Sequence, residues 1–211
     1  MKDILIVGAG GFGREVAWLI EEINEKISEW NILGFIDENE AMYGEELNGY
    51  KVLGGIDKLE DFKNVYIAIA IGNSKVRKDV VRKISKFDCK QATLIHPNVI
   101  MDKKSNSIGK GCIICASNII TVNVNIGNYV IINLDSTVGH DVVLKDFVTI
   151  YPSVNVSGCC TIGQCVELGT GSQIIQGKNI GDYSIIGAGS VVIKNIDSNR
   201  TAVGVPAIIK K

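Results

Sequence analysis

Residues 108–132 read IGKGCIICASNIITVNVNIGNYVII, and an aliphatic side chain returns at every sixth position. The spacing continues without a break as far as Val192. The fifteen positions are Ile108, Ile114, Ile120, Ile126, Ile132, Val138, Leu144, Ile150, Val156, Ile162, Leu168, Ile174, Ile180, Ile186 and Val192. Chance does not produce so long a series, so this stretch is a structural repeat.

A period of six matches neither the 3.6 of an amphipathic helix nor a plain two-residue alternation. Four residues after each aliphatic position the side chain is small or β-branched, with Asn118 and Lys178 as the exceptions. Glycine often follows the aliphatic residue directly, as at Gly109 and Gly139, which suits a tight turn or unusual backbone dihedrals. The pattern predicts a hexapeptide β-helix of five coils, with three short strands in each coil.

The composition fits such a thin core, because 46% of residues are hydrophobic and only 6% are aromatic. The net charge of −1 gives no electrostatic reason to expect nucleic acid or an anionic membrane as a partner. No signal-peptide pattern follows Met1, and no apolar run approaches the roughly 18 residues that a membrane span needs. We therefore expect a soluble, cytoplasmic protein of one or two domains.

Cysteines raise the question of a metal site or a disulfide framework. The six are Cys89, Cys112, Cys115, Cys159, Cys160 and Cys165. In the repeat, Cys112 and Cys160 take the inward small position, whereas Cys115 falls at a turn. One adjacent pair and one CxxC divided between two faces make a poor metal cage. We expect these cysteines to pack as small residues, with no metal bound.

The N-terminal part has a different pattern. Residues 3–7 form an apolar run that stops at the glycine-rich stretch 8–13, and residues 15–27 have helical spacing. Strand, glycine turn and helix in this order favour a phosphate-bearing ligand at the helix start. A second strand, 32–36, ends in Asp37 and Glu38, where a first βαβ unit offers a carboxylate to a ribose hydroxyl. The alternative is a structural turn that binds no ligand.

Residues 41–55 suggest turns and a small hairpin, residues 57–62 a short helix, and residues 65–71 a third strand closed by Gly72. A helix over 74–87 and a fourth strand over 91–95 follow. Three or four parallel strands are only half of a full dinucleotide fold, which argues against a dehydrogenase. His96-Pro97 then forces an extended passage. We predict a Rossmann-like α/β domain over residues 1–95 and a β-helix over residues 96–211.

The two histidines differ in their surroundings. His96 precedes a proline at the domain junction and is interpreted as structural. His140 stands two residues after Val138, so it belongs to a turn and projects out of the coil, with Asp141 directly after it. Imidazole, with an ordinary pKa of about 6.5, can take a proton from an amine or a hydroxyl at neutral pH. A neighbouring carboxylate would raise its basicity and fix its tautomer.

This arrangement favours direct acyl transfer in a ternary complex, in which the freed nucleophile attacks a thioester and a backbone N–H stabilises the oxyanion. The chain also resembles the bacterial sugar acetyltransferases that join a small nucleotide-binding domain to a hexapeptide β-helix. These include nucleotide-amino-sugar N-acetyltransferases and sialic-acid O-acetyltransferases of the NeuD type. The matching stretches are 8–13, 34–37, 70–73, 94–97, 139–141, 186–190 and 204–207.

The resemblance implies a left-handed β-helix and a homotrimer that binds acetyl-coenzyme A between two subunits. By the same resemblance, His140 is the general base and Asp141 tunes it. The residues implied to hold the nucleotide sugar are Gly10, Gly11, Phe12, Asp37, Glu38 and Gly72. Gly158 is implied as the oxyanion donor, and Thr149, Thr170 and Ala188 are implied to line the pantetheine. Relatives often have histidine at the positions of Thr149 and Phe12.

The sequence therefore predicts an acetyl-coenzyme A dependent sugar acetyltransferase of polysaccharide biosynthesis, with a nucleotide-linked amine or a sugar hydroxyl as the acceptor. The sugar, the nucleotide and the length of the acyl group stay open. One alternative is a metalloenzyme similar to γ-type carbonic anhydrase, but that site needs three histidines and the solenoid contains one. A second alternative is a non-catalytic, nucleotide-binding trimeric scaffold.

Overall fold

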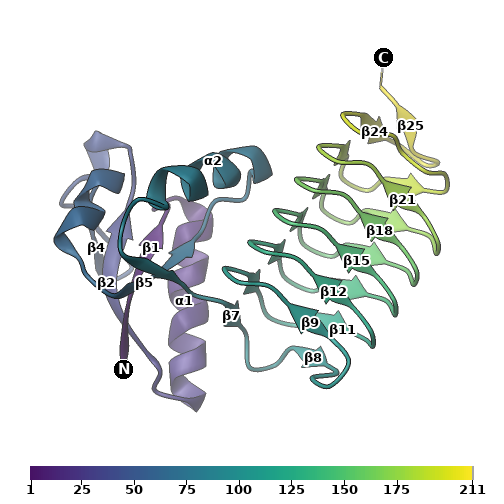
Figure 1. The fold of residues 1–211 in the computed structure, drawn as a ribbon. Coiled ribbons are helices and arrows are strands. Elements are labelled where there is room, and N and C mark those ends of the chain that lie inside the picture. The colour runs from purple at the N-terminus through teal and green to yellow at the C-terminus, as the bar shows by residue number, and fades with distance from the viewer. Residues whose placement is uncertain (211) are drawn as a thin grey trace. The chain divides into compact units, whose positions relative to one another are not determined.

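The computed structural model describes residues 1–210 and divides into two compact units (Figure 1). The first unit covers residues 1–97, and the second begins at Asn98. The division falls directly after the His96-Pro97 step, where the sequence predicts a change of structure. His96 itself is buried, and its Nε2 lies 3.7 Å from Glu22 Oε2 within the first unit.

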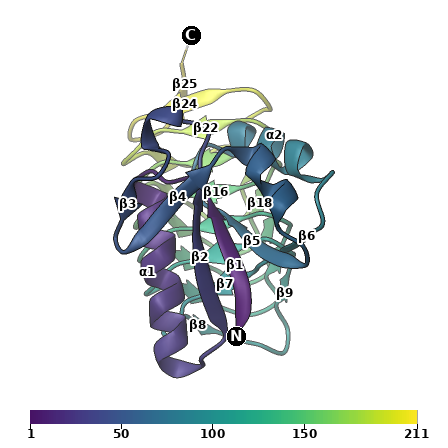
Figure 2. The ribbon, with the colours of Figure 1, turned by 90° about the vertical axis from the view of Figure 1, so that its left-hand side faces the viewer.

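The first unit is built on a six-stranded sheet in the order β3-β4-β2-β1-β5-β6. Its strands are β1 (Lys2–Val7), β2 (Trp30–Ile36), β3 (Glu46–Leu47), β4 (Tyr50–Gly54), β5 (Val65–Ile69) and β6 (Cys89–Gln91). All pairs are parallel except the β3–β4 hairpin at one edge. Strand β1 lies between β2 and β5 (Figure 2), and its residues 4–7 are almost completely buried, as expected for the centre of a parallel sheet.

Two α-helices accompany this sheet. Helix α1 (Gly11–Lys26) buries Val16, Leu19, Ile20 and Ile23, which recur at helical spacing. Helix α2 (Ser74–Ile84) starts at Asn73, whose side chain accepts a hydrogen bond from the Val76 N–H at 3.0 Å. Two 3₁₀ turns, η1 (Glu40–Met42) and η2 (Ile56–Asp61), complete the unit. Within residues 1–210, every helix is too short or too polar to cross a membrane.

Two details of the first unit differ from the sequence prediction. Residues 50–54 form the expected hairpin with β3, but they also pair in parallel with β2 and so add a strand to the sheet. The predicted strand over 91–95 is divided into β6 and a separate β7 (Leu94–Ile95). Both differences arise from pairing between strands distant in sequence, which local periodicity does not report.

The second unit is a left-handed parallel β-helix, and strands β9 to β23 each end on one of the fifteen repeat aliphatics. Its strands are β8 (Ile100–Met101), β9 (Ser107–Ile108), β10 (Ile113–Ile114), β11 (Ile119–Ile120), β12 (Asn125–Ile126), β13 (Ile131–Ile132), β14 (Thr137–Val138), β15 (Val143–Leu144), β16 (Thr149–Ile150), β17 (Asn155–Val156), β18 (Thr161–Ile162), β19 (Glu167–Leu168), β20 (Gln173–Ile174), β21 (Asn179–Ile180), β22 (Ile185–Ile186), β23 (Val191–Val192), β24 (Thr201–Val203) and β25 (Ile208–Ile209).

Three rows of parallel strands form the faces of the coil, and Figure 1 shows the rungs β9, β12, β15, β18 and β21 stacked in order. We call these the β14 row (β8, β11, β14, β17, β20, β23), the β15 row (β9, β12, β15, β18, β21) and the β16 row (β10, β13, β16, β19, β22, β24). From β9 to β23, paired residues are 18 positions apart, as Val138 and Val156 are. The 18-residue coil is the unit that places side chains beside one another.

The repeat aliphatics fill the interior, as predicted. Fourteen of the fifteen are at most 4% exposed, and Ile108, on the first complete rung, is half-buried. Several polar groups at the small inward position find partners there, whereas the buried Ser172 Oγ has none among residues 1–210. Asn118 accepts a hydrogen bond from the Ser136 N–H at 2.9 Å, and Cys112 Sγ lies 3.1 Å from Gly127 O. Cys160 is likewise completely buried, so both inward cysteines pack as small residues.

Left-handed backbone recurs in every turn between β9 and β23, but not at the glycines where unusual dihedrals are expected from the sequence. The third residue after the aliphatic has a positive φ, such as 57° at Asn123, 60° at Asp141 and 59° at Cys159. Gly139, directly after the aliphatic, has no positive φ. A Cβ there would lie 2.7 Å from Gly158 N, so this glycine permits the close approach of two coils.

Candidate active site

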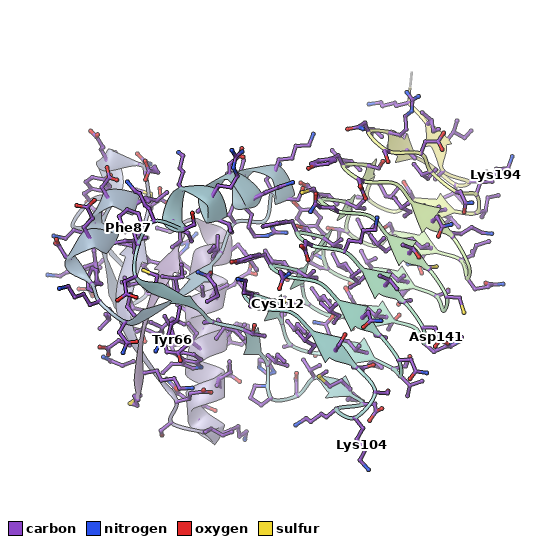
Figure 3. All side chains as sticks on the ribbon, in the orientation of Figure 1. Tyr66, Phe87, Lys104, Cys112, Asp141 and Lys194 are labelled. Carbon is purple, nitrogen blue, oxygen red and sulfur yellow. The ribbon has the colours of Figure 1, made fainter. Side chains whose placement is uncertain are left out.

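His140 lies in the turn between β14 and β15, where the coil changes direction. Its side chain is 60% exposed, so the imidazole stands outside the packed interior, as its place in the repeat predicts. Figure 3 shows the neighbouring Asp141 at the outer edge of the coil. The turn is held by its backbone, because the Asp141 N–H donates to Val122 O and the Cys159 N–H donates to His140 O.

The imidazole is tied to the carboxylate beside it. His140 Nδ1 lies 2.8 Å from Asp141 Oδ2. The pKa of Asp141 is lowered, first by the hydrogen bond from His140 and then by one from Asn123, so the carboxylate stays ionised. An ionised carboxylate only accepts hydrogen bonds, which assigns the proton of a neutral imidazole to Nδ1. Nε2 is then left with a free lone pair, which is what a general base requires.

Gly158 lies one coil above His140, with its backbone against the imidazole. A Cβ at this position would lie 2.5 Å from His140 Nε2, so only glycine leaves the ring its place. Among residues 1–210 the Gly158 N–H has no hydrogen-bond acceptor, although the residue is buried. A basic nitrogen and an unused N–H donor thus share one site, and this pair matches the needs of a reaction with a transient oxyanion.

Sequence reasoning missed two neighbours of this pair. Asn123 lies 18 residues before Asp141 and hydrogen-bonds to its carboxylate. Cys159 lies 18 residues after Asp141 and is exposed, and its Sγ is within 4.8 Å of the ligand atoms of His140 and Asp141. The sequence contains the information needed to find both residues. Three hexads make one coil, so residues 18 positions apart, such as Asn123, Asp141 and Cys159, must stack.

The residues implied to line a coenzyme lie elsewhere on the coil. Thr170 and Ala188 are exposed in stacked turns between the β16 row and the β14 row, a different edge from that of His140. Thr149 lies in β16 and is 1% exposed. Gly158 is the member of this set that the fold brings to the imidazole. The coenzyme contacts of Thr149, Thr170 and Ala188 therefore stay predictions.

The face beside the His140 edge carries two shallow hollows. One, of about 410 Å³, is lined by residues including Asn125, Val143 and Gln164 of the β15 row and its turns. The other, of about 370 Å³, lies further along that row near Thr161 and Asn179. Neither hollow includes His140, which stands on an open edge of the single chain.

The glycine turn of the first unit contains two kinds of glycine. A Cβ at Gly8 would lie 2.8 Å from Ala70 O, and one at Gly13 would collide with Gly8 O, so these two glycines serve packing. Gly10 has nothing within 4 Å of an added Cβ, and Gly11 has only the Arg14 guanidinium at 4.0 Å. No side chain caps the start of α1 within the described residues. Open space before uncapped N–H groups is the setting that binds phosphate.

The other predicted nucleotide residues gather at the same edge of the sheet. Val7 is in register with Ile36 and with Ile69, so the glycine turn, Asp37 and Gly72 all follow the carboxyl ends of adjacent strands. Strand order reverses direction around β1, which is where open α/β sheets bind ligands. The partly exposed Phe12 lies in the first turn of α1.

The two carboxylates at this edge also hold the protein's own backbone. Asp37 Oδ2 accepts a hydrogen bond from the Ala9 N–H at 2.8 Å, and its Oδ1 accepts one from the Asn39 N–H at 2.9 Å. Glu38 Oε1 accepts a hydrogen bond from the Ile56 N–H at 2.8 Å. Both residues therefore shape the loops around the edge.

Arg77 is a further residue that sequence reasoning missed. It is 1% exposed, and its Nη1 donates to Ile71 O at 2.6 Å and to Gly72 O at 2.9 Å. The guanidinium thus fixes the turn that presents Gly72. Nothing in the sequence singled it out, because it lies in a helix rich in lysine and arginine that reads as solvent-exposed.

Comparison with known proteins agrees with this arrangement. Residues 3–84 match the family described as the PglD N-terminal domain. The GDP-perosamine N-acetyltransferase of Escherichia coli O157:H7 is 32% identical over 174 residues, covering 82% of this chain and 77% of that protein.

Two solved structures match along nearly the whole chain. One is a perosamine N-acetyltransferase variant from Caulobacter crescentus with one histidine changed to asparagine, in complex with CoA and GDP-perosamine. It has a TM-score of 0.91 and 26% identity, and the match covers 100% of this chain and 98% of that one. The other is the acetyltransferase domain of PglB from Neisseria gonorrhoeae with acetyl coenzyme A, at a TM-score of 0.90, 28% identity and 99% coverage of both chains.

An α/β unit followed by a left-handed β-helix with an outward histidine defines an acyltransferase of the hexapeptide-repeat class. Within that class, the chain belongs to the sugar acetyltransferase family. The family resemblance predicted from the sequence is confirmed.

Proposed function

We propose that this protein transfers the acetyl group of acetyl-coenzyme A to the amino group of a nucleotide-linked sugar, with His140 as general base. One observation carries the proposal: Nδ1 of the imidazole is held by Asp141 while Nε2 faces the Gly158 backbone. An amine is favoured over a hydroxyl because the GDP-perosamine N-acetyltransferase matches 82% of the chain at 32% identity, whereas a galactoside O-acetyltransferase of Lactococcus lactis matches 73% at 29%.

In the proposed reaction, the amine nitrogen attacks the thioester carbonyl carbon as Nε2 of His140 takes its proton. The carbonyl oxygen becomes an oxyanion, which the Gly158 N–H stabilises. When the tetrahedral intermediate collapses, the C–S bond breaks and the imidazolium gives the proton to the coenzyme A sulfur. The carboxylate of Asp141 stabilises the imidazolium between the two transfers. No acyl-enzyme forms, and no metal takes part.

The nucleotide sugar is proposed to bind at the carboxyl edge of the first unit's sheet, against Gly10, Gly11 and Phe12. The open space at Gly10 and the uncapped start of α1 support a phosphate there. Asp37 and Glu38 would then contribute mainly through the loop backbone that they hold, and Gly72 would border the site from β5. A panel of nucleotide-linked amino sugars identifies the nucleotide and the sugar.

We further propose a homotrimer with acetyl-coenzyme A in a groove between protomers. Thr170 and Ala188 lie on a different edge of the coil from His140, so one chain does not present them to the imidazole. A neighbouring copy that brings its own turns beside that edge would complete the site. A cytoplasmic role in polysaccharide biosynthesis is part of the proposal, because acetyl-coenzyme A and nucleotide sugars are its substrates.

The test is an assay of coenzyme A release with acetyl-coenzyme A and a panel of nucleotide-linked amino sugars. We expect release to match an acetylated sugar of the correct mass, with no acetyl group on quenched protein. Turnover of a sugar hydroxyl instead would correct the acceptor, and silence across the panel would favour the scaffold alternative. Sedimentation analysis of the same sample tests the trimer independently.

A further inference from the structure

The thiol of Cys159 lies beside the proposed catalytic pair and has no part in the reaction. One ligand atom each from His140, Asp141 and Cys159 lies within 4.8 Å of the others, and all three residues are exposed. The arrangement follows from the repeat, because Cys159 stands one coil after Asp141 with the same left-handed backbone. Imidazole, carboxylate and thiol thus converge on one outer edge.

These three groups are the ligand types that zinc takes in proteins, and three protein ligands with one open position are typical of accessible zinc sites. With bonds of about 2.0–2.3 Å, tetrahedral ligands stand about 3.3–3.8 Å apart. Exposed side chains need to move by only about 1 Å to reach that spacing. The thiolate selects thiophilic cations over Mg²⁺ and Ca²⁺, which prefer oxygen.

We propose that His140, Asp141 and Cys159 form an inhibitory site for zinc or a similar thiophilic divalent cation. On binding, the Cys159 thiol loses its proton to solvent, and the metal occupies an imidazole lone pair. The metal here is an inhibitor rather than a cofactor, because it removes the base that the reaction needs. Binding follows from the geometry alone, whereas inhibition rests on the proposed function.

The other cysteines make the site specific. Cys112, Cys115, Cys160 and Cys165 are buried in the β-helix, and Cys89 is partly exposed on β6 of the first unit. Cys159 is therefore the cysteine of the β-helix that a metal ion can reach from solvent. Cys89 offers a matched control, since its replacement removes a thiol from the first unit and leaves every residue of the β-helix unchanged.

The experiment titrates the purified protein with Co²⁺, which reports a bound thiolate by charge-transfer absorption in the near ultraviolet. Coenzyme A is left out, because its own thiol binds the metal. We expect one ion per chain with this absorption, and competition by Zn²⁺. Cys159→Ser should abolish the absorption and weaken binding by at least about 10-fold to 100-fold. His140→Ala should also weaken binding, and Cys89→Ser should leave it unchanged.

Absence of the absorption in the wild type, or its persistence in Cys159→Ser, would overturn the site. With an active preparation, buffered Zn²⁺ should inhibit the wild type and Cys89→Ser alike and inhibit Cys159→Ser much less. Equal inhibition of the two variants would also contradict the proposal. If no acetyl transfer is found while Co²⁺ binds as expected, the proposed function fails and the metal site stands.

Discussion

Two edges of the same β-helix use equivalent backbone positions in opposite ways. At the edge between the β15 and β16 rows, the N–H groups of Asn128 and Gln164 donate to the carboxylates of Asp146 and Asp182, each one coil later. At the His140 edge, the residue one coil later is Gly158, which has no side chain, and its own N–H is unused within residues 1–210. At the first edge, which we call the closed edge, side-chain carboxylates occupy the backbone N–H groups. At the His140 edge, the imidazole and the Gly158 N–H remain available for chemistry.

A regular solenoid contains many equivalent turns. In this protein the proposed function lies at a turn where the side-chain hydrogen bonds between successive coils are interrupted. Because Gly158 has no side chain, it accepts no hydrogen bond from the coil below. The same absence leaves space for the His140 imidazole and keeps the Gly158 N–H available beside it. Disturbing the imidazole of His140 or its place beside Gly158 should therefore change activity, whereas removing a carboxylate on the other edge should change stability.

The largest expected effect follows from removing the base. We expect His140→Ala to lower kcat by at least about 100-fold, the usual scale for a lost general base. Thermal unfolding should hardly change, because the side chain is exposed. Turnover within a few-fold of the wild type, measured by coenzyme A release, would refute the proposed role.

The next largest effect is expected at Gly158, the position without a side chain. Gly158→Ala places a methyl group where the imidazole lies, and a displacement of about 1 Å can cost about 100-fold in rate. The folded state should tolerate the change, because an exposed ring can move away. Gly139→Ala is the contrasting variant, since its Cβ would meet the Gly158 backbone and should lower the unfolding temperature. Thermal denaturation and the rate of coenzyme A release, measured on both variants, separate the effect on stability from the effect on activity.

On the closed edge, Asp146→Ala should reduce the free energy of unfolding by about 1–3 kcal/mol, because the Asn128 N–H loses a charged acceptor 2.7 Å away. Acetyl transfer per folded molecule should be unchanged. Urea denaturation measures the first quantity and the coenzyme A assay the second. A loss of kcat without a loss of stability would show that the division between the edges is wrong.

The smallest effect concerns the carboxylate of Asp141. Its pKa is lowered from an ordinary 3.8 by hydrogen bonds from His140 and Asn123, so Asn123→Ala should raise that pKa toward its ordinary value. Carboxyl-carbon NMR titration of the two proteins measures the change. An unchanged titration midpoint of Asp141 in the variant would show that Asn123 does not lower this pKa.

The sign of the pH effect follows from the lowered pKa. Because the folded-state pKa lies below the unfolded one, the two hydrogen bonds stabilise the fold fully above the ordinary pKa. That contribution is lost as the pH falls through the lowered value. The part of the stability difference between the wild type and Asn123→Ala that comes from this hydrogen bond should therefore be present at neutral pH and disappear in strong acid, whereas the cost of placing alanine at the positive φ of residue 123 remains at every pH. The carboxylate is exposed, so the part that depends on pH should be small.

The sequence predicted more of the second unit than of the first. In the β-helix, a fixed period assigned the buried aliphatics and the outward place of His140, since each residue's environment depends on its position in the hexad. In the first unit, the parallel pairing of residues 50–54 with β2 and the burial of Arg77 depend on contacts between distant segments. Local patterns carry little information about such contacts.

The sequence by itself determined the repeat, the family and the identity of the histidine outside the coil. Only the tertiary structure decided that Nδ1 faces Asp141 while Nε2 faces Gly158, that the N–H of Gly158 is unused, and that Cys159 joins the pair. The physical reason is that periodicity fixes which way a side chain leaves the backbone. Hydrogen bonds depend on where the side chains of neighbouring coils then meet.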